Sequence, residues 1–158
     1  MIRIGHGYDV HATSPERKLV LGGVFIDCGF GLVGHSDADV LTHAVCDALI
    51  GAIGQGDIGK HFPDTDPRYK GADSLVLLSV VAQRVKEAGY RVSNIDVTMI
   101  AQKPKLKDHV PAMEQNIAAA LGIDAGRVNV KATTEENLGF TGAMEGMACH
   151  AVCLLDNK

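Results

Sequence analysis

Side chains alternate in character along residues 2–11, near the start of the chain. A period of two predicts a β-strand. One face of this strand would carry Ile2, Ile4, His6, Tyr8 and Val10, and the opposite face Arg3, Gly5, Gly7, Asp9 and His11.

Three later segments repeat their apolar residues at helical spacing. The first helix is expected from a Ser36 N-cap to Gly54, and the second covers about residues 73–88 and ends at Gly89. The third has Pro111 in its first turn and stops at Gly122. Between the first two, residues 54–72 are rich in Gly, Pro and Asp, which predicts a long surface loop.

The remaining apolar runs predict further strands. Residues 19–21 and 24–26 flank Gly22-Gly23, and this pattern predicts a small hairpin. A Gly-rich loop is expected to follow over residues 28–34. Strands are expected at about 92–101, 128–134 and 146–155. The last is apolar on both faces, so we expect it at the centre of the sheet.

This order of elements favours an α/β (α+β) fold. We expect a two-layer sandwich in which a four-stranded main sheet carries helices on one face, with the small hairpin beside it. A length of 158 residues fits a single domain over residues 1–158.

Composition narrows the functional class. The net charge of -4 argues against a large nucleic-acid surface, which needs a basic excess. We found no apolar run near the ~20 residues of a membrane helix, and we expect a cytoplasmic protein without a membrane partner. The four cysteines are expected to be free thiols in a reducing compartment.

A carboxylate and an imidazole stand two residues apart at Asp9 and His11, so they share one face of the first strand. His43 on the first helix would complete a catalytic-zinc pattern of two histidines and one carboxylate. Asp39 and Asp47 lie four residues either side of His43 and could orient its ring from a polar stripe. The alternative is a D-x-H surface motif beside a solvated helix face.

Two segments suit phosphate. His35 and Ser36 precede a helix N-terminus, where free amides favour an anion, although simple capping would explain them as well. Thr133 and Thr134 end a strand just before acidic residues, which suits a phosphate with bound magnesium; the alternative is an acidic turn.

Two loops add weaker signals. Three lysines surround Pro104 within residues 101–107 and could bind a nucleotide, or simply be solvated. The aspartates of residues 56–66 could bind substrate hydroxyls, or only form turns.

Five ungapped segments together carry a resemblance: G-Y-D-V-H at 7–11, G-H-S-D-A-D-V-L-T-H-A at 34–44, G-D-I-G-K-H-F-P-D-T-D at 56–66, A-Q-K-P-K at 101–105 and K-A-T-T-E-E-N-L-G-F-T-G at 131–142. In this order they resemble the 2-C-methyl-D-erythritol 2,4-cyclodiphosphate synthase family. The resemblance implies a homotrimer with active sites between subunits. It also implies conversion of 4-diphosphocytidyl-2-C-methyl-D-erythritol 2-phosphate to the cyclic diphosphate and CMP, in the non-mevalonate isoprenoid pathway.

The resemblance also implies roles for individual residues. A divalent metal, usually Zn²⁺, would be bound by Asp9, His11 and His43, and Mg²⁺ or Mn²⁺ by Glu136 with the diphosphate. His35 and Thr134 would stabilise the transition state. Substrate would contact Ser36, Asp57, Ile58, Gly59, Phe62, Pro63, Asp64, Thr65, Asp66 and Phe140. The cytidine nucleotide would contact Ala101, Gln102, Lys103, Pro104, Lys105, Leu106, Lys107, Ala132 and Thr133.

One departure from the family pattern concerns Ala143, where relatives often carry an arginine that points to the trimer axis. The expectation is that binding of an isoprenoid diphosphate there is lost or altered. Two alternatives to the cyclase stay open: a zinc-dependent phosphohydrolase that releases inorganic phosphate, and a trimeric binding module without turnover.

Overall fold

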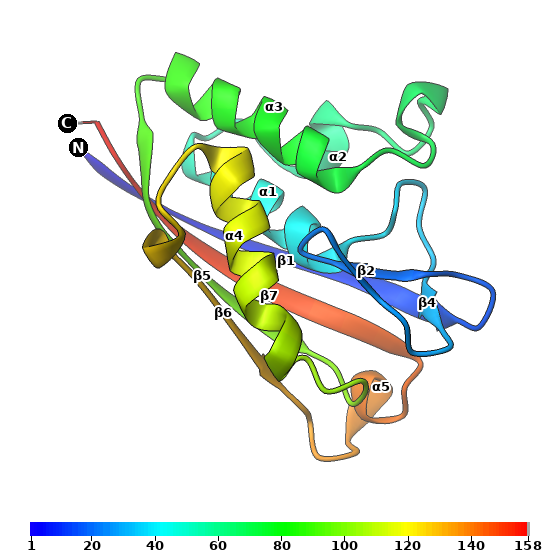
Figure 1. The fold of residues 1–158 in the computed structure, drawn as a ribbon. Coiled ribbons are helices and arrows are strands. Elements are labelled where there is room, and N and C mark those ends of the chain that lie inside the picture. The colour runs from blue at the N-terminus through cyan, green and yellow to red at the C-terminus, as the bar shows by residue number, and fades with distance from the viewer. Residues whose placement is uncertain (158) are drawn as a thin grey trace.

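A five-stranded sheet runs through the centre of the computed structural model, which describes residues 1–157 (Figure 1). Its strand order is β4-β1-β7-β5-β6. The bounds are Ile2–Ser14 for β1, Gly31–Leu32 for β4, Arg91–Ile100 for β5, Val128–Thr133 for β6 and Gly146–Asp156 for β7. The predicted central position of the last strand is confirmed, because β7 pairs with both β1 and β5.

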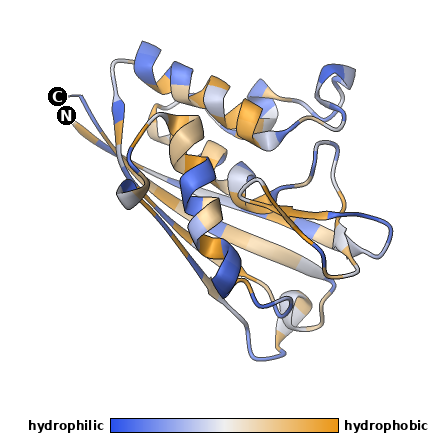
Figure 2. Cartoon of the chain, viewed as in Figure 1, coloured by the Kyte–Doolittle hydropathy of each residue, from blue (hydrophilic) through white to orange (hydrophobic). Residues whose placement is uncertain are grey.

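Three long helices cover one face of this sheet, as predicted (Figure 1). They are α1 (Val40–Ala52), α3 (Ser74–Glu87) and α4 (Val110–Leu121). In Figure 2, hydrophobic and hydrophilic residues alternate along α3 and α4, as expected of helices with one buried face. Short helical segments form α2 (Ile58–His61), α5 (Gly139–Gly142) and 3₁₀ turns at Pro67–Tyr69, Lys107–His109 and Ala125–Arg127.

Glycine allows α1 to lie directly on β1. A Cβ added at Gly5 would stand 1.9 Å from the carbonyl oxygen of Ala48, and one at Gly7 would stand 2.0 Å from that of Ala44. The face of β1 with Gly5, Gly7, Asp9 and His11 is therefore the helix-covered face. The strand brings Asp9 and His11 alongside the first turns of α1.

On the opposite face of the sheet, the described part of the chain places no helix (Figure 1). Ile2 is 68% exposed, Ile4 70% and Tyr8 45%, and Val10 and Val152 are also exposed. A row of exposed apolar side chains on a sheet marks a surface suited to association.

Sequence patterns located most elements. The hairpin is confirmed as β2 (Leu19–Leu21) paired with β3 (Val24–Ile26). The main sheet has five strands instead of the four predicted, because two residues of the expected Gly-rich loop pair with the end of β1 as β4. The expected loop 54–72 also contains α2 and one 3₁₀ turn.

The first helix begins later than predicted. Ala38 has a φ of 59°, a left-handed conformation that a helix cannot include, so residues 36–38 form a turn. Asp39 is the N-cap in place of Ser36, and its side chain accepts from the amide of Thr42. Among the residues that the structure describes, no helix is long and apolar enough to cross a membrane.

Candidate metal and phosphate site

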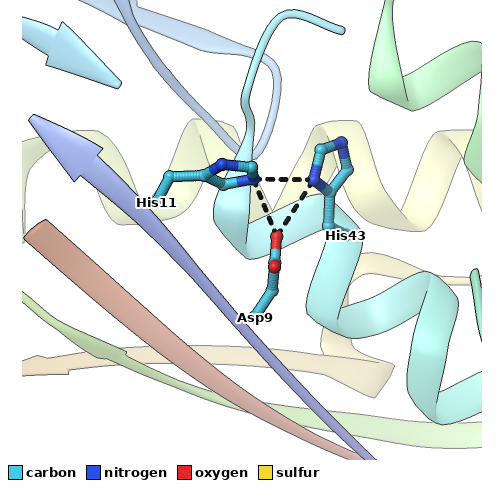
Figure 3. Close-up of side chains that lie close together, drawn as sticks. All are labelled: Asp9, His11 and His43. Atoms are coloured by element: carbon cyan, nitrogen blue, oxygen red, sulfur yellow. Dashed lines mark hydrogen bonds and ion pairs between the residues drawn. The ribbon is translucent and has the colours of Figure 1, made fainter. Parts of the chain in front are cut away.

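Three side chains from two elements converge beside the first turns of α1 (Figure 3). Asp9 and His11 come from β1, and His43 comes from α1. Asp9 Oδ2 lies 3.0 Å from both His11 Nε2 and His43 Nδ1, and these two nitrogens are 3.2 Å apart. Two imidazoles and one carboxylate that meet in this way could hold a divalent metal ion.

The hydrogen bond on the far side of His11 tests how well a cation fits. His11 Nδ1 lies 2.8 Å from the carbonyl oxygen of Val33, which can only accept. His11 therefore carries a proton on Nδ1, and the Nε2 of the neutral ring presents a lone pair to Asp9 and His43. Lone pairs that face one another repel unless a proton or a cation lies between them, so this donor set fits a metal ion.

The pKa values of Asp9 and His11 also reflect how close the three side chains lie. Burial of Asp9 raises the pKa of its carboxyl group, but when protons take the place of a cation between the three groups, hydrogen bonds and charge from His11 and His43 outweigh burial and lower the pKa to about 2. Burial lowers the pKa of His11, whereas the hydrogen bond and charge of Asp9 raise it, and the net change is upward. The carboxylate is thus ionised across the neutral range, as a metal ligand must be.

The prediction that Asp39 and Asp47 orient His43 is wrong. Asp39 is fully buried and accepts from the amides of Gly22 and Gly23. Asp47 accepts from the amide of Ile58 at the start of α2. Both carboxylates thus accept from backbone amides of neighbouring segments, because α1 is buried on several sides and has no single solvated stripe.

Asp9, His11 and His43 are called the metal group below. All three line a cavity of about 460 Å³. Most residues expected to contact the substrate line it, namely Ser36, Ile58, Gly59, Phe62, Pro63 and Asp64, together with His35, which was expected to stabilise the transition state. Gly34, Tyr69 and Leu77 line it as well, and sequence reasoning missed them. Tyr69 could have been noticed because it belongs to the predicted loop 54–72, which contains most of the substrate contacts. Leu77 has the pattern of any buried position on α3.

Four predicted substrate contacts lie outside that wall, and one of them is Phe140, which belongs to α5. Asp57 caps α2 through the amide of Lys60. Asp66 bonds Arg68, and its carbonyl oxygen accepts from His35 Nε2 at 3.0 Å. Neither Thr65 nor Asp66 is among the residues lining the cavity.

A second cavity, of about 510 Å³, lies at the ends of β5 and β6. Its lining contains almost all residues expected to bind the nucleotide: Ala101, Gln102, Pro104, Lys105, Leu106, Lys107, Ala132 and Thr133, together with Thr134. Lys103 is the exception and lines a small neighbouring hollow. Val110, Val130 and Lys131 complete the lining and were not predicted.

A tight turn joins Thr134 to Glu136 next to this second cavity. The Thr134 hydroxyl donates to Glu136 Oε1 at 3.2 Å, and the amide of Glu136 donates to Thr134 Oγ1 at 3.3 Å. Glu136 and Asn137 both have positive φ, which folds the carboxylate back over the threonine. A hydroxyl and a carboxylate held together at a strand end suit a phosphate-bound cation.

Comparison with known proteins shows the family of this chain. A model of the YgbB family matches residues 2–156. The chain belongs to the YgbB family. A curated relative from Trichlorobacter lovleyi, a 2-C-methyl-D-erythritol 2,4-cyclodiphosphate synthase, is 60% identical over 154 residues, which are 98% of each chain.

Solved structures of YgbB relatives share the fold. The bifunctional IspDF from Campylobacter jejuni matches with a TM-score of 0.94 and 49% identity over 98% of this chain, although this chain spans only 42% of that longer protein. An IspF from Plasmodium falciparum, described as a CDP complex, matches with a TM-score of 0.85 and 35% identity, covering 98% of this chain and 95% of that one.

In this YgbB chain, the two cavities share no lining residue. β1 and β6 are three steps apart in the sheet, roughly 14 Å at ~4.8 Å per step. The predicted metal and nucleotide residues are thus gathered into two groups, and one subunit does not bring them into a single pocket.

Proposed function

We infer that this chain converts 4-diphosphocytidyl-2-C-methyl-D-erythritol 2-phosphate to 2-C-methyl-D-erythritol 2,4-cyclodiphosphate and CMP. An oxygen of the 2-phosphate attacks the β-phosphorus, and the bond from that phosphorus to the bridging oxygen breaks, so that CMP leaves with the bridging oxygen. The observation that carries this inference is the Asp9, His11 and His43 group at the mouth of a cavity lined by His35 and Ser36.

The substrate supplies its own nucleophile, so the protein needs mainly to position two phosphates and offset their charge. A divalent ion, such as Zn²⁺, held by Asp9, His11 and His43 would act as a Lewis acid on phosphate oxygens. Without a cation, the carboxylates of Asp9 and Asp64 in that cavity would repel the substrate. Glu136 is our candidate for a Mg²⁺ or Mn²⁺ ligand next to the diphosphate.

The chain's own groups orient the reacting atoms. His35 Nε2 donates to the carbonyl of Asp66, and this hydrogen bond connects the imidazole to the segment 56–66, which was predicted to contact the substrate. Thr134 is fixed by Glu136, and we propose that His35 and Thr134 stabilise charge on the phosphates in the transition state. Lys105 and Lys107 are exposed at the nucleotide cavity, whereas Lys131 already pairs with Asp96 at 2.6 Å.

We also propose that the active protein is a homotrimer in the cytoplasm. Two features support assembly: the exposed apolar face of the sheet, and the separation of the metal and nucleotide groups within one chain. An assembly that places the nucleotide cavity of one subunit against the metal group of its neighbour would complete each site.

Replacement of one metal ligand tests the proposed function. His43→Ala leaves only two ligands, and a two-ligand site holds metal poorly. We expect CMP formation to fall by a factor of about 1,000 or more and bound zinc to be lost, measured by chromatography and elemental analysis. His109→Ala, a histidine outside both groups, is the control and should retain its metal. Full activity of His43→Ala with no bound metal would contradict the assignment.

A further inference from the structure

We propose that Asp37 and Ser74 are positioning residues that fix the ring of His43 so that Nδ1 faces the metal. The inference rests on the proposed metal centre and extends it to a chain of three side chains, Asp37, Ser74 and His43. None of the sequence motifs singled out Ser74, which is the first residue of α3.

The contacts form a continuous path. His43 Nε2 lies 2.8 Å from Ser74 Oγ. The Ser74 hydroxyl forms a short hydrogen bond to Asp37 Oδ1, and the Ser74 amide donates to Asp37 Oδ2 at 3.0 Å. Ser74 is fully buried, so water does not compete for its hydroxyl.

The direction of each hydrogen bond follows from the carboxylate. An ionised carboxylate can only accept, so the hydroxyl proton of Ser74 points to Asp37. Ser74 Oγ then has only lone pairs to offer His43, and His43 Nε2 must donate its proton to them. The neutral ring consequently carries a lone pair on Nδ1, the atom 3.0 Å from Asp9 Oδ2.

Ser36 lies near the same nitrogen but differs from Ser74. Its Oγ is 3.0 Å from His43 Nε2 and accepts weakly from the Ala38 amide at 3.3 Å. Ser36 lines the cavity, and no acidic side chain among the described residues fixes its proton, so it can turn toward a ligand. Ser74 is not among the lining residues and is anchored by two bonds to Asp37. The orienting contact is therefore the one from Ser74.

This path also joins three segments that surround the cavity. Asp37 precedes α1, Ser74 begins α3, and the Asp37 amide donates to the carbonyl of Ala72 at 3.1 Å. Asp37 and Ser74 would make the same contacts if they only held these segments together and did not orient His43. The test must therefore report on the metal ligand field and not only on stability or turnover.

The test compares metal binding by wild-type protein, Ser74→Ala and Asp37→Asn, with Ser79→Ala as a matched serine control on α3. Within residues 1–157, the Ser79 hydroxyl hydrogen-bonds only its own helix, at the carbonyl of Leu75. Zn²⁺ affinity is measured by chelator competition, and the visible spectrum of the Co²⁺-loaded protein reports the ligand geometry. Circular dichroism of each metal-free variant checks that it is folded.

We expect Ser74→Ala and Asp37→Asn to bind Zn²⁺ 10–100-fold more weakly and to shift the Co²⁺ bands, because loss of such outer contacts typically has this effect. Ser74→Thr keeps the hydroxyl and should recover part of the affinity. Asp37→Asn leaves the Ser74 side chain in place, so it serves as the test if Ser74→Ala does not fold.

Wild-type affinity and an unchanged Co²⁺ spectrum in a folded Ser74→Ala or Asp37→Asn protein would overturn the inference and leave the metal centre intact. A separate result would reject both: if wild-type protein and His43→Ala bind Zn²⁺ equally weakly, the proposed metal centre is wrong and there is no ligand to orient.

Discussion

Asp9 and Asp39 are both close to the first turns of α1, but their carboxylates have different partners. Asp9 faces two imidazoles at the cavity. Asp39 is fully buried, caps α1 through Thr42 and also holds the β2–β3 turn through two glycine amides. Burial raises the pKa of Asp39 despite these bonds, so its charge is tolerated only because several donors surround it.

Removal of the Asp39 carboxylate should be costly for folding. Asp39→Ala leaves buried amide donors without partners and removes a helix cap, and we expect a loss of about 3 kcal/mol in the free energy of unfolding. Asp73→Ala is the matched control, since Asp73 caps α3 at an exposed position, and it should lose about 1 kcal/mol. Urea unfolding measures both, and equal losses would contradict the bracing role of Asp39.

The group that could hold a metal ion could be predicted from sequence, whereas the partners of Asp39 could not. Asp9 and His11 are two residues apart, and strand geometry alone places them on one face. The partners of Asp39, Gly22 and Gly23, belong to a hairpin whose position over α1 depends on tertiary packing. Ser74 was missed for the same reason, because it meets His43 only through the docking of α3.

At the scale of elements, the contact between β1 and α1 decides where the metal group forms. Gly5 and Gly7 let the backbone of the helix approach the strand, and His43 thereby comes within 3.0 Å of Asp9. A side chain at either glycine would have to displace the main chain of α1. A close-packed interior cannot accommodate such a shift by moving side chains alone.

A methyl group on β1 tests this contact. Gly7→Ala puts a Cβ 2.0 Å from the carbonyl oxygen of Ala44, and we expect it to lower the free energy of unfolding by about 3 kcal/mol or more and to weaken metal binding. Gly51→Ala is the control, because its Cβ would meet nothing within 4 Å and alanine favours a helix. Thermal unfolding would contradict this account if the two variants were equally stable.

Elements with a clear period or a clear end were predictable. The third helix ends as expected at Gly122, which adopts a left-handed conformation with φ of 68°. The elements that were missed are all short: β4 has two residues, α2 and α5 have four each, and the three 3₁₀ turns have three each. Segments this short show no period, and they form because β1 offers a free edge to β4 and Asp57 caps α2.

At the scale of the whole molecule, the bare sheet face and the two separate cavities point to the same assembly. The exposed residues of β1 and β7 would be covered by other subunits, and the assembly would have three times the chain mass of 16.7 kDa. The sequence pattern did not reveal which face of β1 is left bare, because the exposed face carries the large apolar residues and the helix-covered face carries two glycines and polar side chains. The trimer itself came only from the resemblance and stays a prediction.

Shared active sites can be tested by mixing two inactive variants. His43→Ala damages the metal group and Thr134→Ala the nucleotide side, so neither alone should turn over. In co-expressed trimers with sites between subunits, about one interface in four combines two intact halves, and we expect roughly a quarter of wild-type activity. No recovery in mixed trimers of confirmed mass would show that each site lies within one chain.

The most direct test of the central claim is to ask which oxygen attacks the β-phosphorus. The protein is incubated with 4-diphosphocytidyl-2-C-methyl-D-erythritol 2-phosphate and Mg²⁺ in ¹⁸O-labelled water, and products are followed by phosphorus NMR. We predict CMP and a cyclic diphosphate, both free of ¹⁸O, and no reaction after chelation. Inorganic phosphate, or a product labelled with ¹⁸O, would show that water is the nucleophile and that the enzyme is a phosphohydrolase.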